Sequence, residues 1–164
     1  MAVTAWAAGQ RITADGLNAI TPIFTAWTPT WSTSTGTGTP SIGNGTYDCE
    51  YSRVGNLVTA RFEVVFGTTT NFGGGGTGDN WRFSLPVTAA AITSYAGTAV
   101  LIQSTTLRVF SHVRLTTTGV MELEVSSGQP DGAATANNGL VDLLTPWTWA
   151  SANSIRAFLT YEAA

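Results

Sequence analysis

The sequence predicts an all-β fold: an antiparallel, jelly-roll-like β-sandwich preceded by a short helical and extended arm. From residue 47 onward, apolar and polar residues alternate with a period of two, as in half-buried strands. Turn-forming clusters of Gly, Asn and Pro separate the alternating segments. We therefore divide the chain into an N-terminal anchoring arm (1–30), a Thr/Ser/Gly-rich linker (31–45) and a β-sandwich domain (46–164).

The arm contains one helix signal. Thr13 can accept a hydrogen bond from the amides of the following turn, and Asp15 places negative charge at the helix start. Leu17 and Ile20 then fall on one face, and Pro22 ends the run. A helix of this length is not stable alone, so we expect it to dock on another surface.

The arm also carries more apolar surface than so short a segment can bury by itself. An apolar arm followed by a polar linker is typical of a segment that finds its partner on another chain. We therefore predict that the arm anchors the protein in an assembly. The predicted anchors are Trp6, Ile12, Leu17, Ile20, Ile23 and Phe24.

The strands of the domain are expected where the alternation is clearest. Tyr47, Cys49 and Tyr51 alternate with polar residues, and residues 54–56 (VGN) form a turn into the next strand, which predicts a hairpin. The expected strands are 47–52, 58–66, 81–85, 98–102, 107–115, 120–125 and 155–161. Two Gly- and Asn-rich segments, 67–80 and 126–139, are expected to be loops.

The composition indicates a folded protein with a neutral surface. Charged residues make up 10% of the chain, against about 25% in typical soluble domains. Hydrophobic residues make up 43%, and there are six tryptophans, so disorder does not explain the low charge. Thr and Ser must then cover much of the surface, which suits a protein whose sides contact copies of itself or neighbours in a large assembly.

Several partners and locations are not expected. The net charge is −3, there is no lysine, and the arginines are scattered, so phosphate-based binding to nucleic acid is not predicted. No segment approaches the ~18 apolar residues of a membrane span, so membrane insertion is not predicted. The N-terminus lacks the basic start of a secretory signal, and nothing indicates export by that route.

Residues with reactive side chains are few. Cys49 is the only cysteine, which excludes an internal disulfide and a cysteine-based zinc site, and its place in a strand favours burial. His112 is the only histidine, which excludes a histidine-based metal site and favours a surface or subunit-interface role. We therefore predict no catalytic residues, no metal and no cofactor.

Two pairs of carboxylates are candidates for the catalytic residues of a glycosidase. Asp48 with Glu50, and Glu122 with Glu124, lie two apart on strands, so each pair shares a face at a spacing of roughly 7 Å. Glycoside hydrolysis needs two carboxylates a few ångströms apart. Strand alternation places polar residues at such positions anyway, and solvated or interface faces are the favoured interpretation.

Two further groups admit a binding interpretation. Asp131, Asn137 and Asn138 could offer oxygens to calcium, but their spacing does not match an EF-hand loop and a turn explains the same residues. Trp147 and Trp149 would share a face if the segment is extended. Exposed, they are candidate glycan contacts; buried, they fill a core or a subunit interface, which is the commoner outcome.

A family resemblance runs through most of the chain. Trp6 with residues 8–18 (AGQRITADGLN), followed by residues 27–31 (WTPTW), resembles virion proteins of tailed phages that infect actinobacteria, of the minor tail protein or tail fibre type. The C-terminal third is the least distinctive. The body segments that share the resemblance are 42–46 (IGNGT), 51–56 (YSRVGN), 66–73 (FGTTTNFG) and 81–86 (WRFSLP).

The resemblance implies an assembly role in the virion, with the particle put together in the host cytoplasm. The expected protein is a homotrimer whose arm attaches to the tail or to the major capsid protein, and whose β domain projects outward and contacts host-surface glycan or only decorates. One alternative is a capsid decoration protein or head fibre on the outer shell. Alternatives of other classes are a carbohydrate-binding module, using the tryptophans and the two long loops, and a glycosidase or depolymerase, using the carboxylate pairs.

Overall fold

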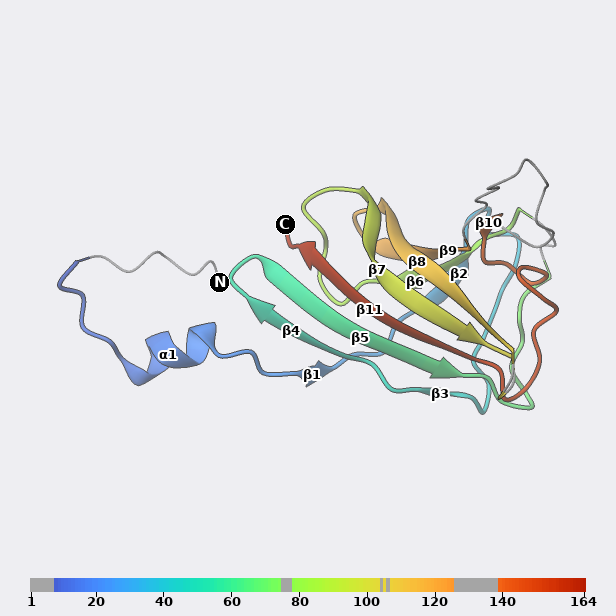
Figure 1. Ribbon diagram of the computed structural model, residues 1–164, viewed down its shortest axis with the longest axis horizontal. Coiled ribbons are helices and arrows are strands. Elements are labelled where there is room, and N and C mark those ends of the chain that lie inside the picture. Colours follow the sequence, from blue (N-terminus) through green and yellow to red (C-terminus); the bar gives the residue numbers. More distant parts are fainter. Residues whose placement is uncertain (1–7, 75–77, 104, 106, 126–138) are drawn as a thin grey trace.

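The computed structural model describes residues 8–74, 78–103, 105, 107–125 and 139–164. One helix, α1 (Ala14–Ile20), precedes the strands, and every strand pairing is antiparallel, which confirms the predicted all-β fold (Figure 1). The strands are β1 (Thr25–Ala26), β2 (Trp31–Thr33), β3 (Thr46–Tyr47), β4 (Glu50–Val54), β5 (Leu57–Val65), β6 (Trp81–Ser84), β7 (Thr93–Ile102), β8 (Arg108–Thr117), β9 (Val120–Val125), β10 (Gly139–Leu140) and β11 (Ser154–Glu162).

The strands form one sheet that curls so that its two halves face each other. The order along the sheet is β1-β4-β5-β11-β7-β8-β9-β6-β2, with β3 paired to β5 and β10 paired to β9. Four strands lie between β5, which carries Phe62, and β6, which carries Phe83, yet the ring centroids of the two phenylalanines are 4.9 Å apart. The fold is therefore sandwich-like, with one core between the two halves.

The seven predicted strands are present, and alternation explains their burial. Along β5, Val58, Ala60, Phe62 and Val64 are fully buried while the residues between them are partly exposed. The predicted hairpin joins β4 to β5, and Gly55 has a φ of 60°, a left-handed conformation that glycine adopts without steric cost. Inward-facing apolar residues every second position thus fix which face of each strand meets the core.

The segment predicted as a linker is instead partly built into the sheet. Trp31 in β2 is 7% exposed, and its ring lies 4.7 Å from that of Trp81, centroid to centroid. β2 pairs with β6, and the backbone groups of Ser41 and Asn71 bond to each other farther along. Three strand residues surrounded by Thr, Ser and Gly leave no visible alternation, so the sequence pattern hid this strand.

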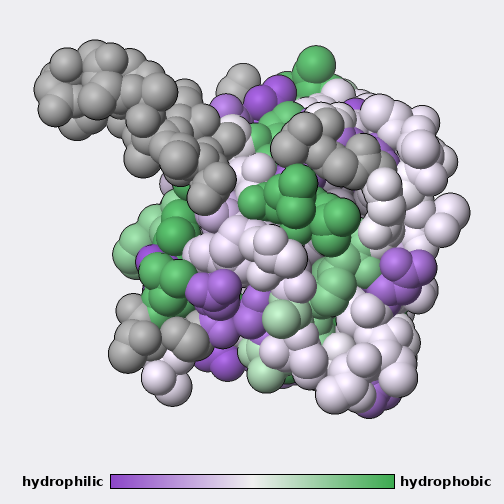
Figure 2. All heavy atoms as spheres, turned by 90° about the vertical axis from the view of Figure 1, so that its right-hand side faces the viewer, coloured by the Kyte–Doolittle hydropathy of each residue, from purple (hydrophilic) through white to green (hydrophobic). Residues whose placement is uncertain are grey.

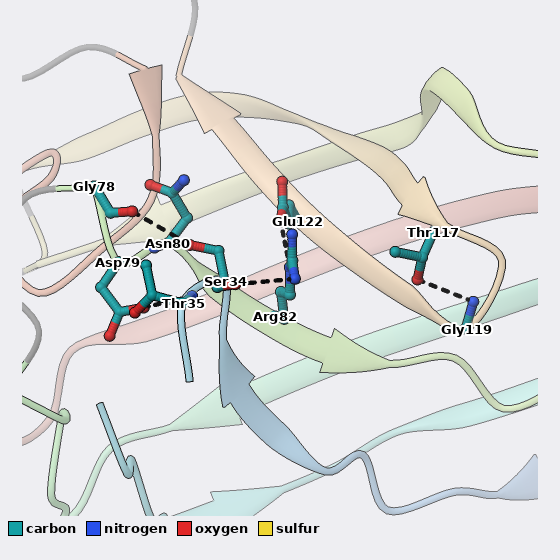
Figure 3. Close-up of polar contacts among 9 residues, drawn as sticks. All are labelled: Ser34, Thr35, Gly78, Asp79, Asn80, Arg82, Thr117, Gly119 and Glu122. Carbon is teal, nitrogen blue, oxygen red and sulfur yellow. Dashed lines mark hydrogen bonds and ion pairs between the residues drawn. The ribbon is translucent and has the colours of Figure 1, made fainter. Parts of the chain in front are cut away.

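A buried carboxylate holds the turn that follows β2. Asp79 is 4% exposed and accepts hydrogen bonds from the backbone N–H of Thr35 at 2.9 Å and from the Thr35 hydroxyl (Figure 3). It also accepts one from the N–H of Gly38 at 2.8 Å. Asp79 lies in the segment predicted to be a loop, and its hydrogen bonds to Thr35 and Gly38 tie that loop to a distant part of the chain.

Candidate functional site

The arm projects from the domain with its apolar side chains exposed. In Figure 1, α1 stands clear of the sheet and joins it through an extended segment that enters β1. Five of the six predicted anchors lie in the described part of the chain, while Trp6 lies outside it. Their exposed fractions are 65% for Ile12, 49% for Leu17, 41% for Ile20, 65% for Ile23 and 50% for Phe24.

The local sequence explains why α1 begins and ends where it does. Thr13 Oγ1 accepts a hydrogen bond from the N–H of Gly16 at 3.1 Å, which satisfies one of the free amides of the first turn. At the other end, the hydroxyl of Thr21 donates to the carbonyl of Leu17 at 2.9 Å. A helix of one to two turns gains little from its own hydrogen bonds, so burial of its apolar side chains has to stabilise it.

The outer face of the sheet carries a second exposed apolar surface. Phe110 on β8 is 79% exposed and Phe158 on β11 is 54% exposed. Both lie at positions of their strands that point away from the core, because their neighbours Ser111 and Leu159 are buried. We did not single out these residues from the sequence, although a phenylalanine at the polar position of an alternating strand is a signal that could have found them.

A shallow hollow lies beside Phe158. Its volume is about 340 Å³, and its outward-pointing side chains come from β5, β11 and β7. Phe158 stands opposite Arg61 on one side and Thr98 on the other. The side chains that form the hollow's outer rim are Arg61, Glu63, Thr98, Val100, Arg156 and Phe158.

The carboxylates of the outer face are engaged by cations. Arg61 Nη2 lies 2.9 Å from Asp48 and 3.2 Å from Glu50, so the first predicted pair shares one guanidinium. Glu124 Oε2 is 2.9 Å from Arg114 and 3.2 Å from the Nε2 of His112. Carboxylates held in this way are ordinary components of a polar sheet face.

Glu122, the other member of the second pair, is buried. Its Oε1 accepts a hydrogen bond from the Nε of Arg82 at 2.7 Å, and 2% of the Glu122 side chain is exposed (Figure 3). Arg82 also donates to the carbonyl of Ser34 at 3.4 Å, so its guanidinium joins β9, β6 and the end of β2. The ion pair between Glu122 and Arg82 is therefore structural.

The two candidate glycan tryptophans follow the burial alternative. Trp149 is 4% exposed and its indole N–H donates to the carbonyl of Thr145 at 3.1 Å. Trp147 is partly buried, with its ring centroid 5.3 Å from that of Trp149, and it packs against the core. Trp149 is therefore wrong as a glycan contact, because its ring faces the core and not solvent.

The remaining candidates are Cys49 and the loop residues weighed for calcium. Cys49 is buried as expected, and burial raises the pKa of its thiol to about 11, although the hydrogen bond to the Glu63 carbonyl acts in the opposite direction. Asp131, Asn137 and Asn138 lie outside the described residues. Within the described ranges, no three or more His, Cys, Asp or Glu side chains gather as a metal site would require.

The end of the molecule opposite α1 is of mixed hydropathy. Figure 2 shows that pale residues of intermediate hydropathy predominate there, with green apolar patches and purple hydrophilic residues among them. Among the described residues, no helix is both long enough and apolar enough to cross a membrane.

Comparison of the chain with protein-family models, with curated proteins and with solved structures finds no match.

Proposed function

We propose that this protein is a non-enzymatic structural component of a tailed-phage virion, of the minor tail or tail fibre type. Its N-terminal arm attaches to neighbouring proteins, and its β domain projects outward. The observation that supports this proposal is the exposure of five apolar side chains on an arm that stands clear of its own domain. A short helix with exposed apolar residues is a docking element and has no other evident use.

Magnitudes support docking through the arm. Burying a Leu, Ile or Phe side chain contributes about 1.5–3 kcal/mol before the entropy of association is counted. Five such side chains offset a large part of the roughly 4–15 kcal/mol that association costs in lost freedom. A closed assembly of three copies engages three arms at once, and cyclic symmetry lets every copy make the same contacts.

The attachment site is the tail or the major capsid protein. A capsid decoration protein or head fibre on the outer shell is the alternative, and it would use the same arm. Both versions place the protein in the virion, assembled in the host cytoplasm. They differ in which neighbour receives the arm, and an image of the intact particle distinguishes them.

A structural role also accounts for the polar groups. The carboxylates that would serve a glycosidase are held by arginines or buried in the domain. The carbohydrate-binding alternative loses Trp149, since that ring is in the core. The test for the enzyme alternative is direct: the intact protein should leave host cell-wall polymer undegraded.

The main experiment removes the arm. A variant that lacks residues 1–24 keeps all the strands, so it should fold and remain in solution but fail to enter particles, as measured by mass spectrometry of purified virions. The triple variant Ile12→Ser, Leu17→Ser, Ile20→Ser should behave in the same way. The matched control is Leu57→Ser, which removes a side chain of 55% exposure from the β4–β5 hairpin and should enter particles normally. Normal incorporation of the arm variants would refute the proposal.

A further inference from the structure

The exposed phenylalanines of the outer face belong to one patch. β11, β7 and β8 are consecutive in the sheet. Phe158 lies opposite Thr98, and Phe110 lies opposite Val100, two residues farther along β7. Adjacent strands are about 4.8 Å apart and two residues span about 6.7 Å along a strand, so the two phenylalanines stand about 12 Å apart across β7. Large apolar side chains grouped on the exposed face of central strands mark an interaction surface.

The patch has the composition of a protein contact surface. Two aromatic side chains and Val100 form its centre. Ion pairs surround them, with Arg156 bound to Glu63 on β5 at 2.9 Å. An apolar, aromatic centre with a polar rim is the usual arrangement of an interface. The hollow of about 340 Å³ beside Phe158 gives this surface room to receive a side chain.

The arm of the same chain stands clear of its own domain, beyond the ends of the strands, with its apolar side chains exposed (Figure 1). We propose that the arm of one copy packs on the outer face of β11, β7 and β8 of the next copy. This inference rests on the proposed function, in which the arm is the assembly element. The arm and the face are different surfaces, so the contact is head-to-tail. Such a contact forms a ring when the rotation between copies closes, as in the proposed trimer, and an open filament when it does not.

The estimated area of one contact indicates that a single arm binds weakly and that three contacts in a closed ring are needed for a stable assembly. Residues 8–24 comprise about 10 Å of helix and about 33 Å of extended chain, and a helix is about 10 Å wide. The footprint is then roughly 400 Å² on each side, or about 800 Å² for one contact, below the ~1,000 Å² of a stable interface. Three contacts in a ring bury about 2,400 Å². One arm is therefore weak by itself, and three arms stabilise a trimer.

Charge is compatible with this contact. The described arm carries one charge of each sign, Arg11 and Asp15, and the next charged residue along the chain is Asp48. The cations next to the phenylalanines are already paired: Arg156, opposite Val100, with Glu63, and Arg61, opposite Phe158, with Asp48 and Glu50. The apolar residues from Leu17 to Phe24 thus meet the phenylalanines without like-charge repulsion, while Arg11 and Asp15 meet the rim.

Cross-linking between differently tagged copies tests the inference. In a Cys49→Ser background, Leu17→Cys is placed in one copy and Thr98→Cys, which is exposed beside Phe158, in the other. The two are co-expressed, purified through both tags and treated with a short bis-maleimide. We expect a cross-linked species that contains both tags, at a yield at least tenfold above that obtained when Leu57→Cys replaces Thr98→Cys.

Equal yields with Thr98→Cys and Leu57→Cys would overturn the inference. A double variant with Leu17→Cys and Thr98→Cys in the same chain that cross-links only within monomers would also overturn it, because the arm would then cover its own face. These outcomes are independent of the particle assay. If the arm deletion still abolishes incorporation while this cross-link is missing, the proposed function stands and the docking surface is wrong.

A second measurement uses the face alone. Phe110→Ser and Phe158→Ser remove exposed side chains, so the thermal midpoint should stay within a few degrees of the unmodified protein. Sedimentation velocity should show association at least tenfold weaker for each variant, since each removes a buried apolar contact per interface. Unchanged sedimentation together with lost retention on immobilised host-surface glycan would identify the face as a glycan site and overturn the inference.

Discussion

The carboxylate of Asp79 accepts a hydrogen bond from the backbone N–H of Gly38 at 2.8 Å, across 41 residues of sequence. Burial by itself raises the pKa of this carboxyl. The hydrogen bonds donated by Thr35, Thr33 and Gly38 outweigh that effect and lower the pKa to about 2, from 3.8. The charged form of Asp79 is therefore favoured in the folded state.

This relationship predicts acid-dependent stability. Because the folded pKa lies below the unfolded one, the contribution of Asp79 is fully present above about pH 4 and is lost as the pH falls toward 2. The free energy of unfolding, from urea titrations, should drop by about 2 kcal/mol over that range. Asp79→Asn should lose a similar amount at pH 7 and lack this part of the pH dependence. Asp15→Asn on the exposed arm is the control and should retain it.

The buried ion pair between Arg82 and Glu122 should be costly to break. Glu122→Gln leaves a partly buried guanidinium without its carboxylate, so we expect a loss of about 3 kcal/mol in unfolding free energy. Glu124→Gln, whose side chain is 30% exposed, should cost under about 1 kcal/mol. A double-mutant cycle with Arg82→Gln measures the coupling directly. Equal losses at the two glutamates would contradict this reading of the pair.

Gly97 should not tolerate a side chain. A Cβ atom at this position of β7 would overlap the carbonyl oxygen of Phe158 on the neighbouring strand. We expect Gly97→Ala to destabilise the fold by about 2–4 kcal/mol, because only backbone movement could relieve the contact. Gly119→Ala, where nothing lies within 4 Å of the added atom, should change the unfolding midpoint little. Thermal denaturation followed by circular dichroism compares the two.

The thiol of Cys49 should be unreactive in the folded protein. Burial raises its pKa to about 11, and 4% of the residue is exposed, so at pH 8 almost no accessible thiolate exists. Labelling with a disulfide reagent should be at least a hundredfold faster in urea than in native buffer. The control is Leu57→Cys in a Cys49→Ser background, which should react rapidly in both. Rapid native labelling of Cys49 would show that the segment between β3 and β4 opens readily.

The long strands could be predicted from the sequence because their physics is local. Along β5 every second residue is buried, from Val58 to Val64, and that period is visible without a structure. β2 could not be predicted, since its three residues have no period and Trp31 is buried by contacts with distant residues such as Trp81. Short strands of this kind depend on the partner strand and not on their own sequence.

The two candidate surfaces differ in the same way: one depends on a local sequence pattern and the other on contacts between distant residues. The exposed apolar arm could be predicted because an apolar segment followed by a polar one is visible in sequence, and Ile12 and Ile23 are exposed. Their role as anchors stays a prediction. The apolar patch of the outer face could not be predicted, because Phe110 and Phe158 are distant in sequence and come near each other only through the pairing of β11, β7 and β8. Trp149 shows the converse: an aromatic pair suggested a surface, and tertiary packing took it into the core.

β1 and β2 lie at opposite ends of the strand order, although only residues 27–30 separate them along the chain. The segment that follows the arm thus connects the two ends of the sheet, because β1 pairs with β4 and β2 pairs with β6. Tension on the arm would act first on the hydrogen bonds between β1 and β4, and then on β2, whose Trp31 packs among aromatic rings. If the arm is attached to a particle, force on the protein acts on the two end strands of the sheet. The attachment can then bear no more force than these strand pairings can.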